Sequence, residues 1–368
     1  MKPQAQSYIC DLAPYQPGLP IELVAREYGL DPAKIIKLAS NENPLGMSPK
    51  ARMAVQRALR GSYRYPDQYQ LLQALAARLG VAPNQIVLGN GSNDVLDLAA
   101  RTFLNDGCQA ISSQYAFAVY QIATRSAGAE NVVVPALNYG HDLDAMLAAI
   151  TPTTRVIWLA NPNNPTGTFI PYGQIERFLG DVPKQVLVVL DEAYYEYLGT
   201  ADVVDSVQWL ERYPNLLITR TFSKIYGLAG LRVGYGIAAP QVAGFLNRVR
   251  QPFNAGVLGL AGARAALEDE DFVGRSKKVN AEGRKQLQTG LRVTGLEQLP
   301  AFGNFITFRS TEAAGLNQKL LRAGIIVRPL AGYGMSDWLR VTIGTKEQNS
   351  KFLTALASAH KVSADSST

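Results

Sequence analysis

The strongest signal in this chain is the segment Thr221-Phe222-Ser223-Lys224-Ile225-Tyr226-Gly227-Leu228-Ala229-Gly230-Leu231-Arg232. It places Lys224 beside hydroxyl groups and Arg232 eight residues later. A lysine becomes an imine-forming nucleophile when positive charge or desolvation lowers its pKa, and a phosphate group needs hydroxyl donors and a cation nearby. Thr221, Ser223 and Arg232 could form such a phosphate site. Taken alone, the pattern fits equally well a solvated lysine and a structural arginine on either side of a Gly/Ala-rich turn.

A carboxylate follows a strongly apolar run upstream of this segment. The residues Val186-Leu187-Val188-Val189-Leu190 predict a buried strand, and Asp191-Glu192-Ala193-Tyr194 comes directly after it. Open α/β sheets bind their ligands at the carboxyl ends of their strands. Asp191 could keep a heterocyclic ring nitrogen protonated there, although an aspartate in this position also binds Mg²⁺ or caps a helix. Tyr194 adds a phenol three residues further on.

Two polar loops follow other apolar runs. The first, Asn161-Pro162-Asn163-Asn164-Pro165-Thr166-Gly167, comes after the strand-like run at 156–159, and alone it would be a Pro-rich turn. The second, Gly89-Asn90-Gly91-Ser92-Asn93, lies between the apolar run at 86–88 and a helical pattern at 94–103. A strand, a glycine-containing turn and a helix in this order predict a phosphate site, built from backbone amides and the helix N-terminus.

The overall pattern predicts an α/β protein with two domains. Short β-branched runs at 132–134, 156–159, 186–190 and 216–218 alternate with helical stretches, which indicates a mostly parallel sheet covered by helices. A run near 232–236 fits a further strand. From about residue 270 a charged helix precedes apolar runs at 305–308, 325–327 and 339–343, as in a smaller α+β lobe. We expect a large domain at 46–265, and a small domain at 266–368 together with the N-terminal arm at 1–45.

Composition excludes several classes of protein. The 368 residues are 47% hydrophobic, without an uninterrupted apolar stretch of membrane-spanning length. The start Met1-Lys2-Pro3-Gln4 lacks an apolar signal region, so we expect a cytoplasmic protein. Cys10, Cys108 and the two histidines are too few for a disulfide framework or a metal centre, and His141 could be a surface residue without a task. The net charge of +6 is scattered, which argues for inward-facing arginines rather than a nucleic-acid surface.

Together the motifs resemble those of the fold type I pyridoxal-phosphate (PLP) enzymes of the class I/II aminotransferase superfamily, and within them the histidinol-phosphate aminotransferases. N-P-T-G at Asn164, D-E-A-Y at Asp191, and S-K at Lys224 with Arg232 follow the family's order, separated by 27, 33 and 8 residues. Further family-like segments lie at 12–15, 41–44, 64–67 and 340–345. The resemblance implies a large domain with a mostly parallel seven-stranded-type sheet, a smaller α+β domain, a homodimer, bound PLP and no metal.

The resemblance also implies roles for individual residues. Lys224 would hold PLP covalently and then carry the proton between the substrate Cα and the cofactor C4′. Asp191 would face the ring nitrogen, while Asn164 and Tyr194 would bond the ring oxygen. Phe117 would stack on the ring, with core packing as its other explanation. The phosphate ligands would be Ser92, Asn93, Thr221, Ser223 and Arg232, joined by Tyr65 from the neighbouring subunit.

Three residues are implied as substrate ligands. Arg340 resembles the arginine that binds the α-carboxylate of glutamate and, alternately, the phosphate of histidinol phosphate, because a guanidinium suits both anions. Arg328 resembles a second anion ligand, although it also fits a surface charge at a strand end. Tyr15 resembles a wall of the imidazole pocket. The implied reaction interconverts L-histidinol phosphate and 2-oxoglutarate with imidazole-acetol phosphate and L-glutamate, in histidine biosynthesis.

Other functions fit the same scaffold. An aromatic amino-acid or arogenate/prephenate aminotransferase would use a similar aromatic pocket, and threonine-phosphate decarboxylases share the motif order. A transcriptional regulator that joins a PLP domain to a DNA-binding winged helix would need an extra N-terminal module. Family-like sequence begins by Leu12, which is why we do not expect such a regulator.

Overall fold

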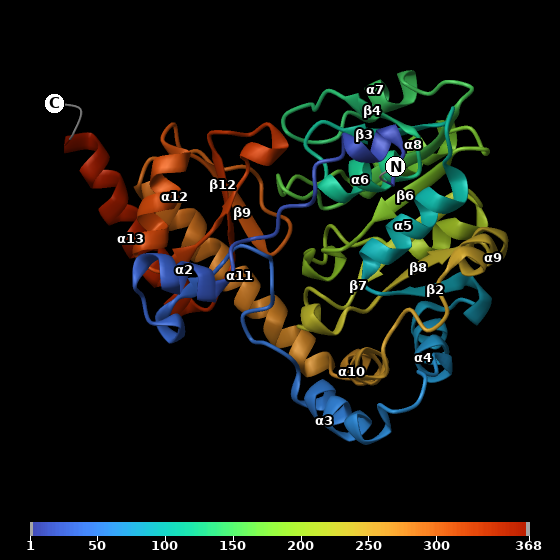
Figure 1. The fold of residues 1–368 in the computed structure, drawn as a ribbon, viewed down its shortest axis with the longest axis horizontal. Helices are drawn as coiled ribbons and strands as arrows, with labels where there is room; N and C mark the ends of the chain where they lie inside the picture. Colours follow the sequence, from blue (N-terminus) through green and yellow to red (C-terminus); the bar gives the residue numbers. More distant parts are fainter. Residues whose placement is uncertain (1–2, 366–368) are drawn as a thin grey trace.

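The computed structural model describes residues 3–365, with side chains through Ala359, and arranges them in two lobes. Figure 1 shows the larger lobe on the right and the smaller one on the left, with the long helix α11 (Glu270–Val293) leading from one to the other. In the N-terminal segment, α1 (Ser7–Cys10) contacts α6 (Ala118–Ser126) of the larger lobe. The chain then crosses to the smaller lobe, where α2 (Ile21–Tyr28) lies.

A seven-stranded sheet forms the centre of the larger lobe. Its strands are β2 (Ile86–Gly89), β3 (Gln109–Ser113), β4 (Glu130–Val134), β5 (Thr154–Ala160), β6 (Leu187–Asp191), β7 (Leu216–Thr221) and β8 (Gly234–Ala238). They lie in the order β2-β8-β7-β6-β5-β3-β4. Only β8 runs antiparallel to its neighbours β2 and β7, and the other pairs are parallel. The predicted α/β fold with a mostly parallel sheet is confirmed.

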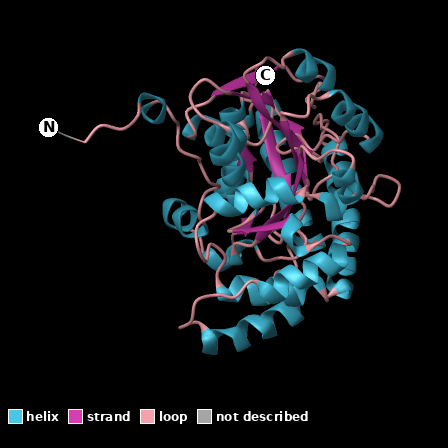
Figure 2. Ribbon diagram, turned by 90° about the vertical axis from the view of Figure 1, so that its right-hand side faces the viewer, coloured by secondary structure: helices cyan, strands magenta, loops and turns pink. Residues whose placement is uncertain are grey.

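Alternation along the strands gives the sheet two buried faces. Within β5, Ile157 and Leu159 pack into one core, and Val156 and Trp158 into the other. Successive strand residues point to opposite faces, so each face needs its own cover of helices. On the Trp158 side these helices are α5 (Ser92–Phe103), α6 and α9 (Pro240–Val249). On the other side they are α3 (Pro49–Ala58), α4 (Tyr69–Leu79), α7 (Leu143–Ala148), α8 (Tyr172–Asp181) and α10 (Val257–Leu267). Figure 2 shows the sheet between these two layers.

The smaller lobe contains two short sheets. The strands β11 (Arg328–Pro329), β12 (Trp338–Thr342) and β9 (Phe305–Arg309) form an antiparallel sheet in that order, while β1 (Ile36–Lys37) pairs in parallel with β10 (Ile325–Ile326). The helices α11, α12 (Ala313–Arg322) and α13 (Lys346–Asp365) pack against the three-stranded sheet. Because β1 comes from the N-terminal segment, that part of the chain joins the smaller lobe. The domain boundaries at 45/46 and 265/266 stay a prediction.

Two local expectations are incomplete or wrong. The strand β3 was not expected, because Gln109-Ala110-Ile111-Ser112-Ser113 has little apolar character, yet it lies between β4 and β5. His141 is not at the surface: it is buried, with Nε2 3.0 Å from the carbonyl oxygen of Ala160, and burial lowers its pKa to about 4. Within residues 3–365, no helix is long and apolar enough to cross a membrane.

Candidate active site

A cavity of about 250 Å³ lies at the carboxyl ends of β6 and β7, where residues of both lobes meet. Every residue predicted for the site lines it, with the exception of Tyr65. These are Tyr15, Ser92, Asn93, Phe117, Asn164, Asp191, Tyr194, Thr221, Ser223, Lys224, Arg232, Arg328 and Arg340. The structure therefore gathers residues that are up to 325 positions apart in the sequence, from Tyr15 to Arg340, around one cavity.

Lys224 lies three residues after the end of β7, and its amine faces the cavity. Nζ is 3.3 Å from the carbonyl oxygen of Ser40 and 5.6 Å from the centre of the Tyr194 ring. Burial lowers the pKa of this amine to about 8, and the positive charges of Arg340 and Arg232 act in the same direction. A substantial fraction of the amine is thus neutral near pH 8, as a nucleophile or general base requires.

Asp191 ends β6 as a buried carboxylate with two side-chain donors. The hydroxyl of Tyr120 donates to its Oδ2 at 2.7 Å, and that of Thr219 donates to its Oδ1 at 3.0 Å. Burial raises the pKa of the Asp191 carboxyl, whereas these two hydrogen bonds oppose the rise. No cation pairs with this carboxylate among the ion pairs of the described residues, so it can hold a proton or a protonated nitrogen on the cavity side.

Tyr120 is the residue of this group that the sequence did not single out. It is fully buried, and its ring stacks on Trp158 with 5.4 Å between centroids and an interplanar angle of 1°. It comes one helical turn after Phe117, the residue that precedes α6. The signal was the spacing within Tyr115-Ala116-Phe117-Ala118-Val119-Tyr120, which brings two aromatic residues to the same side of a helix start.

The residues predicted for a phosphate site surround the start of α5. Gly91 precedes the helix at φ 80°, and Ser92 is its buried first residue. Arg232 lies against this turn: Nη2 donates to the carbonyl oxygen of Asn90 at 3.3 Å, and Nη1 is 3.4 Å from the Ser223 hydroxyl. A Cβ atom on Gly91 would come 2.3 Å from Arg232 Nη2, so the close approach needs glycine. Backbone amides, hydroxyls and a guanidinium converge as an anion site requires.

Arg340 brings the smaller lobe to the cavity. It lies in β12 with 6% of its surface exposed, and it donates to Asn164 Oδ1 and, at 2.9 Å, to the carbonyl oxygen of Ala39. Its Nε has no hydrogen-bond partner in the described part of the chain. Burial also lowers the pKa of Arg340. Arg340 lines the cavity, and a guanidinium there is suited to bind an anion.

Tyr194 and Asn41 join the two lobes next to Lys224. Asn41 Nδ2 donates to the Tyr194 hydroxyl at 2.8 Å, and the Asn41 backbone adopts a left-handed φ of 57°. The Asn41 backbone N–H donates in turn to the hydroxyl of Thr342, the last residue of β12. Asn41 belongs to the family-like run at 41–44, but sequence reasoning assigned it no role.

The N-terminal arm crosses the cavity mouth. Tyr15 packs edge-on against Phe117 with 6.4 Å between ring centroids, and the Arg328 guanidinium lies 5.8 Å from the Tyr15 ring. Arg328 also donates to the carbonyl oxygen of Gln16 at 2.5 Å. The predicted anion ligand Arg328 therefore holds the arm in place in this structure.

Tyr65 lies apart from the other predicted residues. Its side chain is 81% exposed and stacks on Phe253, with 4.4 Å between ring centroids. It does not line the cavity of its own chain. This position leaves Tyr65 able to reach a neighbouring molecule, and its predicted contact across a dimer stays a prediction.

Comparison with known proteins decides the family. The model of the class I and II aminotransferases matches residues 33–356. This chain belongs to that family. Histidinol-phosphate aminotransferase 1 of Dechloromonas aromatica is 59% identical over 97% of this chain and 98% of its own length. Histidinol-phosphate aminotransferase 2 of Nitrosospira multiformis is 56% identical over 96% of this chain and 91% of its own length.

Solved structures agree with this assignment. The histidinol-phosphate aminotransferase of Sinorhizobium meliloti, crystallised with pyridoxal-5'-phosphate, superposes on this aminotransferase with a TM-score of 0.90 and 28% identity, covering 98% of this chain and 99% of that one. Aspartate aminotransferase of Thermus thermophilus, solved with maleate, has a TM-score of 0.84 at 21% identity over 97% of this chain and 100% of that one, and shows the shared fold. The predicted family and fold type are confirmed.

Proposed function

We propose that this aminotransferase uses PLP to transfer the amino group of L-histidinol phosphate to 2-oxoglutarate, in histidine biosynthesis. One observation carries the proposal: the half-buried Lys224, whose amine has a pKa lowered to about 8, shares a single cavity with the buried carboxylate of Asp191 and with Arg340 and Arg328. The relatives named histidinol-phosphate aminotransferase, at 54–59% identity over nearly the whole chain, support the choice of substrate.

The cavity fits PLP at both ends of that molecule. Ser92, Thr221, Ser223 and Arg232 would hold the phosphate at the start of α5, together with Asn93. At the other end, the Asp191 carboxylate has no cationic partner of its own, and it would keep the ring nitrogen protonated. Phe117 would cover the ring, and Asn164 and Tyr194 would bind its oxygen. When bound, PLP supplies an electron sink for the charge that develops at the substrate α-carbon.

Lys224 would perform the proton transfer. Its Nζ would take the proton from the substrate α-carbon and pass it to C4′ of the cofactor, which requires an amine with a substantial neutral fraction near physiological pH. Burial provides this state by lowering the pKa to about 8. The hydrogen bond to the Ser40 carbonyl holds the amine at the cavity wall.

Two arginines would bind substrate anions. Arg340 offers a planar guanidinium at the cavity, a group that suits either a carboxylate or a phosphate. Arg328, whose guanidinium lies over the Tyr15 ring, would bind a second anion once its hydrogen bond to the Gln16 carbonyl is broken. Phosphate and carboxylate ligands can then occupy the same pocket in alternate half-reactions.

A homodimer in the cytoplasm is part of the proposal. Exposed aromatic residues at 63, 65, 69 and 253 lie on one side of the larger lobe, and Tyr65 among them would complete the phosphate site of a second copy. Cys10 and Cys108 are free thiols, in keeping with a reducing compartment. Gel filtration with light scattering tests the dimer, and fractionation of the source cells tests the location.

A spectroscopic titration tests the function. PLP-loaded protein is mixed in separate experiments with histidinol phosphate, phenylalanine, tyrosine or threonine phosphate, and the absorbance of the bound cofactor is followed through one turnover. Rapid conversion to the pyridoxamine form with histidinol phosphate alone supports the proposal. Equal or faster conversion with phenylalanine and tyrosine would instead indicate an aromatic aminotransferase, and release of carbon dioxide from threonine phosphate would indicate a decarboxylase.

A further inference from the structure

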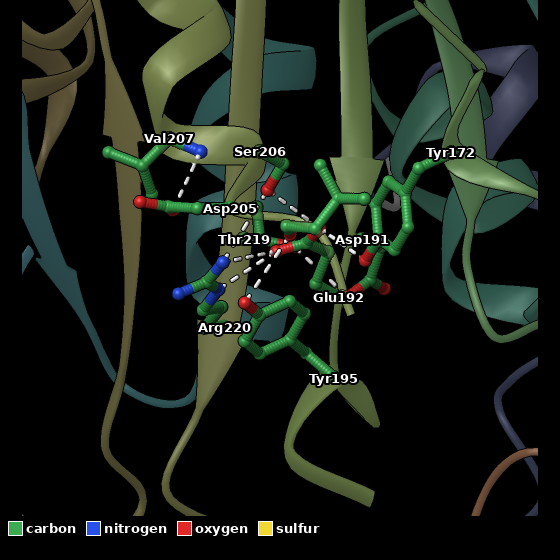
Figure 3. Close-up of polar contacts among 10 residues, drawn as sticks. Tyr172, Asp191, Glu192, Tyr195, Asp205, Ser206, Val207, Thr219 and Arg220 are labelled. Atoms are coloured by element: carbon green, nitrogen blue, oxygen red, sulfur yellow. Dashed lines mark hydrogen bonds and ion pairs between the residues drawn. The ribbon is translucent and has the colours of Figure 1, made fainter. Parts of the chain in front are cut away.

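A buried ion pair lies directly behind the active site. Glu192 follows Asp191 at the end of β6, and Arg220 is the next-to-last residue of β7. Figure 3 shows the two side chains together, close to Asp191 and Thr219. Neither of them lines the cavity. Neighbouring residues of a strand point to opposite faces, so Asp191 and Thr219 meet on the cavity side, and Glu192 and Arg220 meet on the other side.

Both carboxylate oxygens of Glu192 and two nitrogens of the Arg220 guanidinium have polar partners. Arg220 Nε and Nη2 each lie 2.8 Å from Glu192 Oε2. Glu192 Oε1 accepts from the Tyr172 hydroxyl at 2.7 Å and from the Ser206 hydroxyl at 2.8 Å. The Arg220 guanidinium lies over the Tyr195 ring, 3.9 Å from its centre. The Glu192 side chain is fully buried, and 6% of the Arg220 side chain is exposed.

Stability alone is a weak reason for such a pair. Burying two charges requires their desolvation, and well-packed apolar side chains of similar volume often stabilise a fold as much or more. A buried pair with fixed hydrogen bonds instead restricts the backbone segments that carry it to one relative position. The pair connects the two segments that carry Asp191 and Lys224. Glu192 is the next residue after Asp191 in the chain, and Arg220 is four residues before Lys224.

The ends of β6 and β7 are thus connected at three points. The Glu192 backbone N–H donates to the Thr219 carbonyl oxygen at 2.9 Å. On the cavity side, the Thr219 hydroxyl bonds the Asp191 carboxylate. On the opposite side, Glu192 bonds Arg220 and also Tyr172 of α8, so the strand ends are held against a covering helix.

We propose that Glu192 and Arg220 are positioning residues, which fix the distance between the Asp191 carboxylate and the Lys224 amine. The inference rests on the proposed function, in which Asp191 faces the cofactor ring nitrogen and Lys224 moves the proton. If the pair is broken, β6 and β7 keep their ladder, but the segments beyond their ends shift. A displacement of about 1 Å at a reacting group can reduce a rate about a hundredfold.

The test compares variants of the pair with a matched control at the opposite end of the same strands. Glu192→Gln removes the charge but keeps the shape, and Arg220→Lys keeps the charge but loses the planar fork. The control is Asn215→Ala: the buried Asn215 joins the beginnings of β6 and β7, with Nδ2 donating to the Val186 carbonyl oxygen at 2.9 Å. All variants are purified with PLP. The measurements are the melting temperature, the midpoint of the pH titration of cofactor absorbance, and kcat and KM for histidinol phosphate.

We expect both pair variants to move the absorbance midpoint by about half a pH unit or more. We expect kcat to fall about tenfold or more, with KM nearly unchanged. Asn215→Ala should lower the melting temperature and leave the midpoint and kcat as in the wild type. If the pair variants behave like Asn215→Ala, the role is structural and the inference is wrong. If only Glu192→Gln shifts the midpoint, the effect comes from charge and positioning is likewise rejected.

Two further comparisons keep the outcome decisive. If Glu192→Gln does not fold, Arg220→Lys and Tyr172→Phe decide, because each removes part of the pair's hydrogen bonding and leaves the Glu192 charge in place. The absorbance midpoint needs no substrate, so it judges the inference even if wild-type protein does not react with histidinol phosphate, a result that would reject only the proposed substrate. Wild-type protein without any PLP absorbance would reject the proposed function and the inference together.

Discussion

Replacing Tyr120 by phenylalanine tests how the buried Asp191 carboxylate is stabilised. The change removes only the hydroxyl that donates to Asp191 Oδ2 at 2.7 Å, and the ring that stacks on Trp158 remains. A hydrogen bond to a charged buried group contributes about 1.5–3 kcal/mol. Thr219 continues to donate to the other oxygen, so the carboxylate stays partly satisfied. We therefore expect the cofactor-free variant to lose about 2 kcal/mol of unfolding free energy at neutral pH.

The size of this loss depends on pH, with a defined sign. Burial raises the pKa of Asp191 above its ordinary value, so the folded protein binds more protons than the unfolded chain between those two pKa values. Stability falls as pH increases through that window. The hydrogen bond from Tyr120 lowers the pKa of folded Asp191 and so narrows the pH range between the folded and unfolded pKa values. Removing this hydrogen bond extends that pH range upward. The deficit of Tyr120→Phe is thus largest at neutral pH and shrinks on acidification, where Asp191 is protonated in both proteins.

Urea unfolding of cofactor-free protein between about pH 5 and 8 measures the effect. Tyr28→Phe is the matched control, because it removes a hydroxyl that donates to the uncharged Gln318 in an exposed place, and it should change stability by less than about 0.5 kcal/mol. A deficit for Tyr120→Phe that is equally large at both ends of the pH range would refute the reasoning. So would a deficit no larger than that of the control.

Three further predictions concern other parts of the site. Cofactor-free protein should bind PLP covalently with a rate that rises with pH to a midpoint of about 8, measured by borohydride trapping, because only the neutral Lys224 amine attacks; a midpoint near the ordinary lysine pKa of about 10.4 would contradict this. Arg340→Lys should raise KM for both histidinol phosphate and 2-oxoglutarate about tenfold, since one ammonium cannot replace a planar fork, and steady-state kinetics with an unchanged KM would count against it. Gly91→Ala should weaken PLP binding about tenfold in equilibrium dialysis, because its φ of 80° and the nearby Arg232 exclude a Cβ, whereas Gly230→Ala, with open space around it, should bind PLP normally.

The sequence predicted those site residues that follow a strand directly. Asp191 was recognisable because a charged residue after five buried apolar residues belongs at a ligand-binding sheet edge, and Lys224 because of its hydroxyl neighbours and Arg232. Tyr120 was not, since its hydroxyl reaches Asp191 only once α6 packs against β5. The ion pair of Glu192 and Arg220, 28 positions apart, likewise depends on the register of β6 against β7, which the sequence does not reveal.

The strand β3 shows the same limit at the level of the fold. Gln109, Ser112 and Ser113 are poor strand signals, yet the two serines are buried because strands on either side and helices on both faces enclose them. Arg328 gives the complementary case: the family resemblance implied an anion ligand, whereas its contact with the Gln16 carbonyl depends on the path of the N-terminal arm. Local patterns indicate chemistry, and long-range packing decides which partner a side chain meets first.

The charge of the cavity connects the anion sites to the lysine. Of the ionisable side chains that line it in the described structure, Lys224, Arg232, Arg328 and Arg340 are basic, against the acidic Asp191 and Glu42. After burial, the nearby charge of Arg340 is the largest cause that lowers the pKa of Lys224, and Arg232 adds to it. An anion bound at either arginine cancels part of that repulsion and must raise the pKa of the Lys224 amine. The guanidinium groups that we propose to bind phosphate and carboxylate would therefore make Lys224 a weaker base when they are empty and a stronger one when the substrate is in place.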